Sequence, residues 1–174
     1  MLLTEIQETL NKYGLDAARL ELEITESAMT SDINRTVEVL DKLSQMGVKL
    51  AIDDYGTGFS SLSYLKKFTV DFLKIDKSFV IGMINDLHDA SIVRSTIELA
   101  HNIGLKVVAE GVEDNETLTL LASMGCEIAQ GYYFSRPLSV FELPRWMKNS
   151  PWGFSMSPDI DQHIATGSLQ NTFH

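Results

Sequence analysis

Charged and amide side chains recur in this sequence where short apolar runs end. They are Glu23, Asp53, Asp54, Lys74, Glu110, Glu113 and Gln130. Several carboxylates that share one cavity repel one another, so they need protons or a cation to coexist. Carboxylate oxygens suit hard divalent ions such as Mg²⁺ or Mn²⁺. The pattern therefore indicates an acidic metal site.

Asp53 and Asp54 follow the apolar run 48–52 and precede the turn Tyr55-Gly56-Thr57-Gly58. Adjacent strand residues point in different directions, but at a frayed strand end both could reach two ions. The alternative is a turn with an aspartate cap. Two aspartates at the end of an apolar run favour the functional interpretation.

Lys74 lies inside the run 72–75, where a lone charge is costly unless carboxylates pair with it. It could orient water or a phosphate oxygen, or it could be an edge-strand lysine in solvent. Glu110 precedes a glycine and is a candidate metal ligand or general base. Gln130 adds a neutral donor and acceptor, with a packed amide as the alternative.

Glu23 shares strand parity with Glu21, so both point away from the face of the neighbouring leucine and isoleucine side chains. The alternative is a solvated glutamate at a strand end. We expect structural roles for Glu26 and Glu113, as loop or supporting residues. Asp76 fits the cap of the next helix.

The elements that must position these residues follow a repeating βα order. Strands are expected at 20–24, 48–52, 72–75, 105–109 and 127–129, and helical periodicity lies between them. Helices are expected to begin near Asp32 and Asp114, and another contains Ile92. Their expected ends are Gly47, Gly125 and Gly104 respectively. Parallel strands bring their carboxyl ends to one face, so the polar residues should converge.

A complete (βα)8 barrel takes about 250 residues. Five βα units therefore predict either a smaller open α/β sheet or a TIM-like barrel without its N-terminal strands. Residues 1–150 form the expected domain, and 151–174 form an extended or partly disordered tail. Ser139 and Glu142 have capping-box spacing for a last helix, which Pro144 should weaken or kink.

Composition narrows the function classes. The 174 residues carry a formal net charge of -10, which disfavours binding to a DNA backbone. Cys126 is the only cysteine, which excludes an internal disulfide. The four histidines lack zinc-like spacing. No apolar run is long enough to span a membrane and no signal peptide is recognisable, so a cytoplasmic location is expected.

Five motifs in order, ELEITES, AIDDYGTGFSSL, LKIDKSF, VVAEGVE and AQGYYFSRP, resemble the EAL-domain family of bacterial cyclic-di-GMP phosphodiesterases. The resemblance covers residues 20–137. It implies a TIM-like (βα)8 barrel, here about its last five βα units. It also implies that two Mg²⁺ or Mn²⁺ ions assist hydrolysis of one phosphodiester bond of cyclic-di-GMP, giving pGpG.

The resemblance also implies individual roles. Glu23 resembles a ligand of the first ion, Asp53 a bridge, Asp54 a second-ion ligand and Glu110 a second-ion ligand or base. Lys74 and Gln130 resemble residues that hold the attacking water, while Glu26 and Glu113 resemble residues that steady the site. No residues are assigned to the remaining substrate contacts.

The sequence departs from the family pattern, because it contains no Glu-Ala-Leu triplet. An asparagine ligand expected just before Met1 is missing as well. We therefore expect a C-terminal portion of the domain with weak or no activity alone, which self-associates or pairs with the missing N-terminal part. The alternatives are a noncatalytic cyclic-di-GMP-binding or protein-interaction module and a carboxylate-metal enzyme with another substrate.

Overall fold

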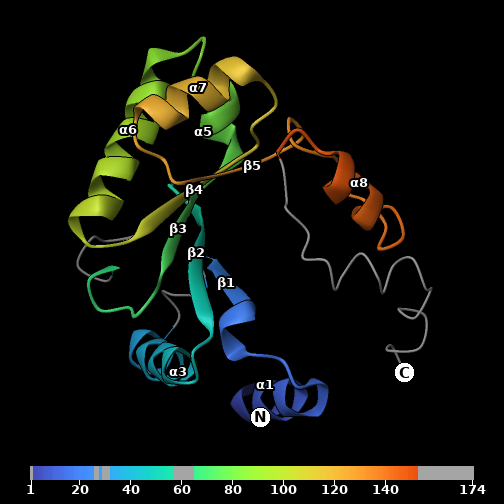
Figure 1. Cartoon of the computed structure of the whole chain (residues 1–174). Helices are drawn as coiled ribbons and strands as arrows, with labels where there is room; N and C mark the ends of the chain where they lie inside the picture. The colour runs from blue at the N-terminus through green and yellow to red at the C-terminus, as the bar shows by residue number, and fades with distance from the viewer. Residues whose placement is uncertain (1, 26–27, 29–31, 57–64, 153–174) are drawn as a thin grey trace. The chain divides into compact units, whose positions relative to one another are not determined.

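The computed structural model describes residues 2–25, 28, 32–56 and 65–152. Its central feature is a parallel sheet in the order β1-β2-β3-β4-β5 (Figure 1). The strands are β1 (Glu21–Thr25), β2 (Lys49–Tyr55), β3 (Phe72–Ile75), β4 (Lys106–Glu110) and β5 (Ile128–Gln130). The sheet confirms the predicted parallel α/β fold. Only β3 has the predicted bounds; the others begin one residue later, and β2 runs three residues further.

Helices precede and connect the strands. They are α1 (Leu2–Tyr13), the 3-10 helix η1 (Ala17–Arg19), α3 (Ile33–Gln45), α5 (Lys77–Gly82), α6 (Leu87–Asn102) and α7 (Asn115–Ser123). Asp32 and Asp114 cap α3 and α7 as predicted; Asp114 Oδ1 accepts from the Thr117 N–H at 2.7 Å. Helix α6 begins before the predicted apolar stripe because Asp86 caps it, accepting from the His88 N–H at 2.7 Å.

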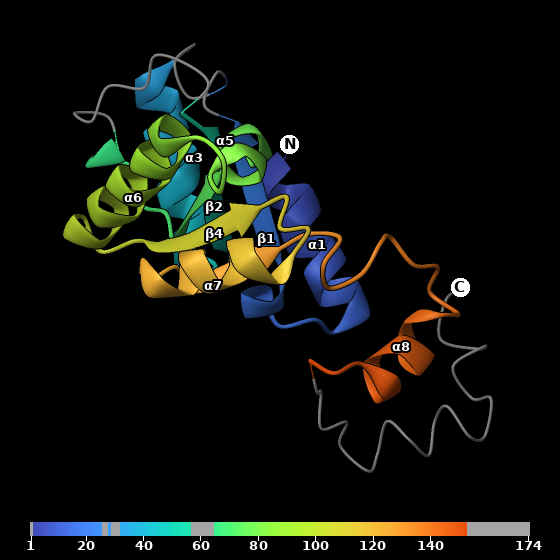
Figure 2. The same cartoon turned by 90° about the horizontal axis from the view of Figure 1, so that it is seen from above.

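The helices pack on the strands that they connect. Helix α3 contacts β2, and α6 contacts β3 and β4 (Figures 1 and 2). Helix α5 contacts β4 and α6. The strands between them are apolar along most of their length because parallel strands are covered on both faces. The polar ends of the strands are the exceptions to this rule.

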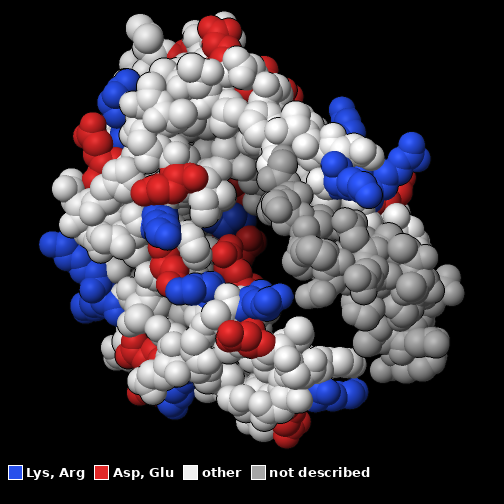
Figure 3. Space-filling view, in the orientation of Figure 1, with Lys and Arg blue, Asp and Glu red and all other residues white. Residues whose placement is uncertain are grey.

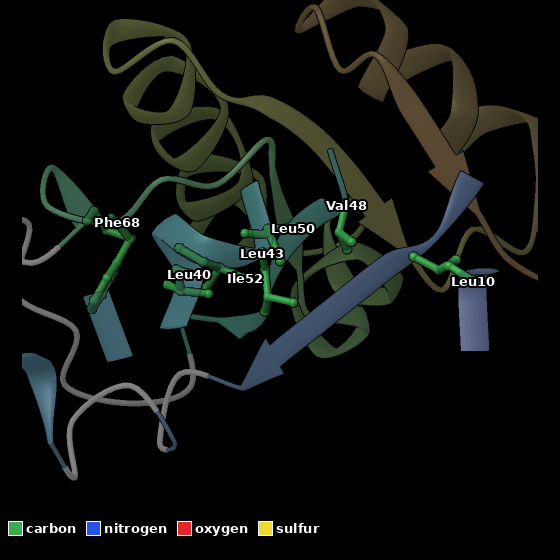
Figure 4. Packing of buried hydrophobic residues seen from close by; sticks show 8 residues of the cluster. Leu10, Leu40, Leu43, Val48, Leu50, Ile52 and Phe68 are labelled. Atoms are coloured by element: carbon green, nitrogen blue, oxygen red, sulfur yellow. The ribbon is translucent and has the colours of Figure 1, made fainter. Parts of the chain in front are cut away.

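One hydrophobic cluster joins α1, α3 and β2 (Figure 4). Leu40 and Leu43 of α3 meet Leu50 and Ile52 of β2, all nearly inaccessible to solvent. Burying a side chain of this size stabilises the fold by about 1.5–3 kcal/mol. This packing fixes β2, whose last residues carry Asp53 and Asp54.

Residue contacts divide the chain into two compact units, residues 1–133 and 134–174. The domain boundary expected after residue 150 stays a prediction. In the second unit, α8 (Leu143–Asn149) begins at the residue after Glu142. Pro144 therefore lies in the first turn, where proline is tolerated, and not at an interior position where it would kink the helix. Glu142 accepts from the Ser139 N–H at 3.1 Å, one half of the expected capping box.

Candidate functional site

Lys74 of β3 lies at the centre of an acidic cluster. Its Nζ atom is 2.5 Å from Glu23 Oε1, 3.2 Å from Asp53 Oδ1 and 2.7 Å from Glu110 Oε1. These carboxylates come from β1, β2 and β4, and Lys74 is only 4% exposed. The alternative of a solvent-exposed edge lysine is wrong, because β3 is the middle strand and the lysine is buried and paired.

Strand register explains this convergence. Lys74 is aligned with Val108, so Glu110 is two residues further along β4 and on the same face. On the other side, Glu23 is aligned with Ala51, two residues before Asp53. The alternation of side chains therefore directs three carboxylates toward one lysine. Glu23 points away from the apolar side chains of β1, as its strand parity predicts.

A β-bulge changes the direction of Asp54 relative to Asp53. The pairing of β2 with β3 shifts between Ile52 and Tyr55, and Asp54 has a φ of 55°, in the left-handed region. Adjacent residues of a regular strand point apart, but here oxygens of Asp53, Asp54 and Glu110 lie within 4.8 Å of one another. These three residues form the group best placed to hold a metal ion in the described part of the chain.

Electrostatics make this group suitable for a cation. Burial raises the pKa of Asp54, and the negative charges of Asp53 and Asp76 raise it further. The Asp53 Oδ1 atom is buried and forms an ion pair with Lys74 Nζ at 3.2 Å, but no hydrogen bond from a described residue reaches it with good geometry. A divalent ion would add positive charge beside this oxygen and its neighbours.

Lys74 remains protonated in this environment. Burial by itself lowers the pKa of a lysine, but the contacts with the carboxylates of Glu110, Glu23 and Asp53 outweigh burial and raise it. A permanently charged ammonium can hold carboxylates together and donate to a further oxygen atom, but it cannot accept a proton from water. Lys74 is thus suited to positioning and not to general-base chemistry.

The remaining candidates lie at different distances from the cluster. Gln130 is exposed at the end of β5, with its Cα aligned with that of Glu110, and Glu113 is exposed in the loop after β4. Glu26 lies outside the described residues. Asp76 caps α5 as predicted, accepting from the Ser78 N–H at 2.9 Å. Its negative charge also contributes to the raised pKa of Asp54, after burial and the charge of Asp53, and the sequence alone did not indicate this proximity.

Two other acidic residues have a structural role at the opposite strand ends. Asp71 precedes β3 and accepts from the Leu50 N–H of β2 at 3.0 Å. Glu127 precedes β5 and accepts from the Val107 N–H of β4 at 3.0 Å. Both satisfy a neighbouring backbone donor at the amino end of the sheet. The acids at the carboxyl ends, gathered around a lysine, are the functional candidates.

Basic and acidic side chains are mixed on part of the surface of the molecule. On the face in Figure 3, Lys and Arg side chains lie among Asp and Glu side chains instead of forming one broad area of a single sign. Among the helices that the structure describes, none is long and apolar enough to cross a membrane.

The comparisons with known proteins agree with this geometry. The EAL domain family model matches residues 2–137. The chain is 43% identical over 159 residues to "Cyclic di-GMP phosphodiesterase NbdA" of Pseudomonas aeruginosa, an alignment that covers 91% of this chain and 20% of that protein. The chain thus spans about a fifth of the length of this curated relative.

Solved structures show the same fold. The MucR phosphodiesterase of Pseudomonas aeruginosa, in a c-di-GMP complex, is 39% identical with a TM-score of 0.79, covering 82% of this chain and 57% of that one. The BlrP1 protein of Klebsiella pneumoniae, in a manganese and c-di-GMP complex, is 36% identical with a TM-score of 0.72, covering 78% and 34%. The parallel sheet therefore corresponds to part of a TIM-like EAL structure. The family model matches most of this chain, and together with these relatives it shows that the chain belongs to the EAL domain family.

Proposed function

We propose that this chain carries the catalytic centre of a cyclic-di-GMP phosphodiesterase, which hydrolyses one phosphodiester bond to give pGpG. The observation that carries the proposal is the convergence of Asp53, Asp54 and Glu110 within 4.8 Å beside the buried Lys74. A relative named as a cyclic di-GMP phosphodiesterase and a phosphodiesterase bound to c-di-GMP support the choice of substrate.

Mg²⁺ or Mn²⁺ fits the oxygen-only ligands of this site, and BlrP1 has been solved with manganese. Asp53, Asp54 and Glu110 would hold one ion, and Glu23 would share a second with Asp53. Divalent ions in such a pair polarise a phosphodiester and lower the pKa of the attacking water. The buried Asp53 Oδ1 atom, which accepts no hydrogen bond of good geometry from the described residues, supports the presence of a cation here.

The protein side chains have separate tasks in the proposed reaction. The Lys74 ammonium holds Glu23, Asp53 and Glu110 in place and donates a hydrogen bond to the attacking water, with Gln130 as its second partner. Glu110 Oε accepts the proton that this water loses. The water oxygen bonds to phosphorus, the P–O3′ bond breaks and the leaving O3′ takes a proton from solvent water, so the product has a 5′-phosphate and a free 3′-hydroxyl group. Glu113 and Glu26 steady the loops around the site.

The ligands for the first of the two ions are incomplete in this chain. Within these 174 residues there is no Glu-Ala-Leu triplet, the motif from which the family takes a metal-binding glutamate and a phosphate-contacting arginine. Glu23 forms an ion pair with Lys74, and it does not belong to the group formed by Asp53, Asp54 and Glu110. We therefore propose that hydrolysis by this chain alone is slow.

The test is incubation of the purified chain with cyclic-di-GMP and Mn²⁺ or Mg²⁺, followed by chromatographic detection of pGpG. Asp53→Asn and Glu110→Gln should abolish the product, whereas Lys49→Met, at the opposite strand ends, should not. Because slow hydrolysis is expected, long single-turnover incubations at high protein concentration are required. Equal pGpG formation by the unmodified chain and by Asp53→Asn would refute the assignment.

A noncatalytic cyclic-di-GMP-binding module is the second candidate, favoured by the incomplete first-ion set. Calorimetric titration with cyclic-di-GMP in Ca²⁺ measures binding separately from hydrolysis. Binding without pGpG formation in Mg²⁺ or Mn²⁺ would support the module. An absence of nucleotide binding would leave a protein-interaction role or a carboxylate-metal enzyme with another substrate.

We also propose that the chain self-associates. In the described sheet, β1 and β5 each pair with one strand only, and Ile128 of β5 is 41% exposed. A groove of about 430 Å³ between α1 and β1 is lined mainly by apolar residues, including Ile6, Leu15 and Leu22. Open edges and apolar surface favour pairing with a second copy. A monodisperse monomer in light scattering at micromolar concentration would contradict this.

A further inference from the structure

Helix α5 follows β3, the strand that carries Lys74 (Figure 1). Its first turn contacts two segments of the candidate site. One is the turn after Asp53 and Asp54, and the other is the loop after Glu110. Both contacts are made at glycines, where backbone approaches most closely. Neither contact involves a group that would touch a metal ion or substrate.

The first contact joins Phe79 to Gly56. A Cβ atom placed at Gly56 would lie 3.1 Å from Cε2 of the Phe79 ring, and Gly56 has a φ of 101°. The ring therefore lies directly against the backbone two residues after Asp54. The β2–β3 pairing shifts between Ile52 and Tyr55, and the pair of Tyr55 with Ile75 is the last one, so the ring supports the backbone directly beyond the end of the ladder.

The second contact joins Lys77 to Gly111. A Cβ atom placed at Gly111 would lie 2.6 Å from Lys77 Cβ and 3.2 Å from Lys77 Cα. Gly111 is the residue immediately after Glu110. The contact uses the backbone and Cβ of Lys77, so its ammonium group is not required.

We infer that the first turn of α5 is a spacer that sets the separation of the Asp53–Asp54 turn from Glu110, with Phe79 and Gly111 as positioning residues. This inference rests on the metal site of the proposed function. The contact of Phe79 with Gly56 limits how the bulge can move, and the contact of Lys77 with Gly111 limits how the backbone at Glu110 can move. The three carboxylates are thereby kept at a separation suited to one ion before any ion binds.

A general packing role does not account for Phe79. The residue of α5 that is fully buried is Val80, whereas Phe79 is only partly buried. Val80 therefore anchors the helix in the core, and Phe79 supports the turn after Asp54. The two functions can be separated by substitution because the side chains are adjacent in sequence but have different surroundings.

The test measures Mn²⁺ affinity from the electron paramagnetic resonance signal of free Mn²⁺, together with the thermal unfolding midpoint of the metal-free chain. Phe79→Ala should weaken Mn²⁺ binding about tenfold, the lower end of the range for residues that support metal ligands. Phe79→Leu restores an apolar side chain against Gly56 and should recover affinity to within about threefold. The control, Val80→Ala, should lower the midpoint while affinity stays within about twofold of the unmodified chain.

Gly111→Ala gives the same test from the β4 side and should also weaken Mn²⁺ binding, whereas Lys77→Ala keeps its Cβ and should not. Circular dichroism verifies that each variant is folded, and Gly111→Ala carries the test by itself if Phe79→Ala does not fold. Unchanged affinity in folded Phe79→Ala and Gly111→Ala, or equal loss in Val80→Ala, would overturn the spacer. If the unmodified chain does not bind Mn²⁺, the metal site itself is wrong and the spacer inference falls with it.

Discussion

Lys74 of β3 and Glu110 of β4 form an ion pair of 2.7 Å across a diagonal of the sheet. Glu110 lies two residues beyond the position opposite Lys74, so the pair exists only if β3 and β4 keep this register. A slip of one residue would turn the glutamate to the other face. The pair therefore links the register of the sheet to the chemistry at its carboxyl ends.

Replacement of Lys74 by methionine should destabilise the metal-free chain by about 2 kcal/mol, because three carboxylates would face one another without a buried cation. Saturating Mg²⁺ should recover part of that loss. Denaturant unfolding with and without Mg²⁺ measures both effects. The control is Lys49→Met, whose exposed pair with Asp71 should contribute less than about 1 kcal/mol. Equal losses in both variants would contradict the account of the cluster.

Replacement of Asp54 by asparagine should raise the stability of the metal-free chain by about 0.5 kcal/mol, since it removes repulsion with Asp53 and Asp76. Asparagine also tolerates the left-handed φ of 55° at this position. Mn²⁺ affinity should nevertheless fall at least about tenfold. Asp54→Val is the comparison: it loses the same charge but should be destabilised by about 1–2 kcal/mol by the backbone conformation. Thermal unfolding and Mn²⁺ titration of both variants check these outcomes.

Glu127 gives the chain a pH-dependent contribution to stability. Burial raises its pKa, but hydrogen bonds from the Val107 N–H and from His101, 3.0 Å away, lower it overall. Because the folded pKa lies below the unfolded value of 4.5, the stabilisation is complete above that pH and is lost as pH falls through the folded pKa.

Glu127→Gln should therefore be less stable than the unmodified chain by about 0.5 kcal/mol near neutral pH, with a difference that disappears in acid. Chemical unfolding at several pH values from about 3 to 6 measures this difference. Glu38→Gln, exposed on α3, is the control and should show no such trend. A constant difference at every pH would mean that the charge of Glu127 is not the cause.

Gly131→Ala should destabilise the chain by about 3 kcal/mol or more, because the new Cβ atom would lie 2.1 Å from the Val112 carbonyl oxygen. That carbonyl accepts from the Tyr133 N–H at 3.0 Å, so the loops after β4 and β5 would separate. Gly104→Ala is a matched control, since Gly104 has a φ of 81° with nothing within 4 Å of an added Cβ. Its cost should be backbone strain alone, about 1 kcal/mol. Similar midpoints for the two variants would exclude the steric explanation.

The sequence by itself determined the order of strands and helices and the positions of the polar strand ends. Apolar runs such as Phe72–Ile75 and capping residues such as Asp114 act locally, through side chains a few residues apart, so their effect is visible in one dimension. The convergence of the strand-end acids followed from parallel topology. The five ordered motifs also identified the family that the comparisons show.

Only the tertiary structure decided how the site is assembled. The direction of Asp54 depends on a bulge in the pairing of β2 with β3, whereas strand alternation alone would point this side chain away from Asp53. The choice between a solvated and a buried Lys74 depended on β3 being the middle strand with neighbours on both sides. The contacts of Phe79 and Lys77 with Gly56 and Gly111 join residues more than 20 positions apart. Such contacts are set by the packing of whole elements, for which no short stretch of sequence carries the signal.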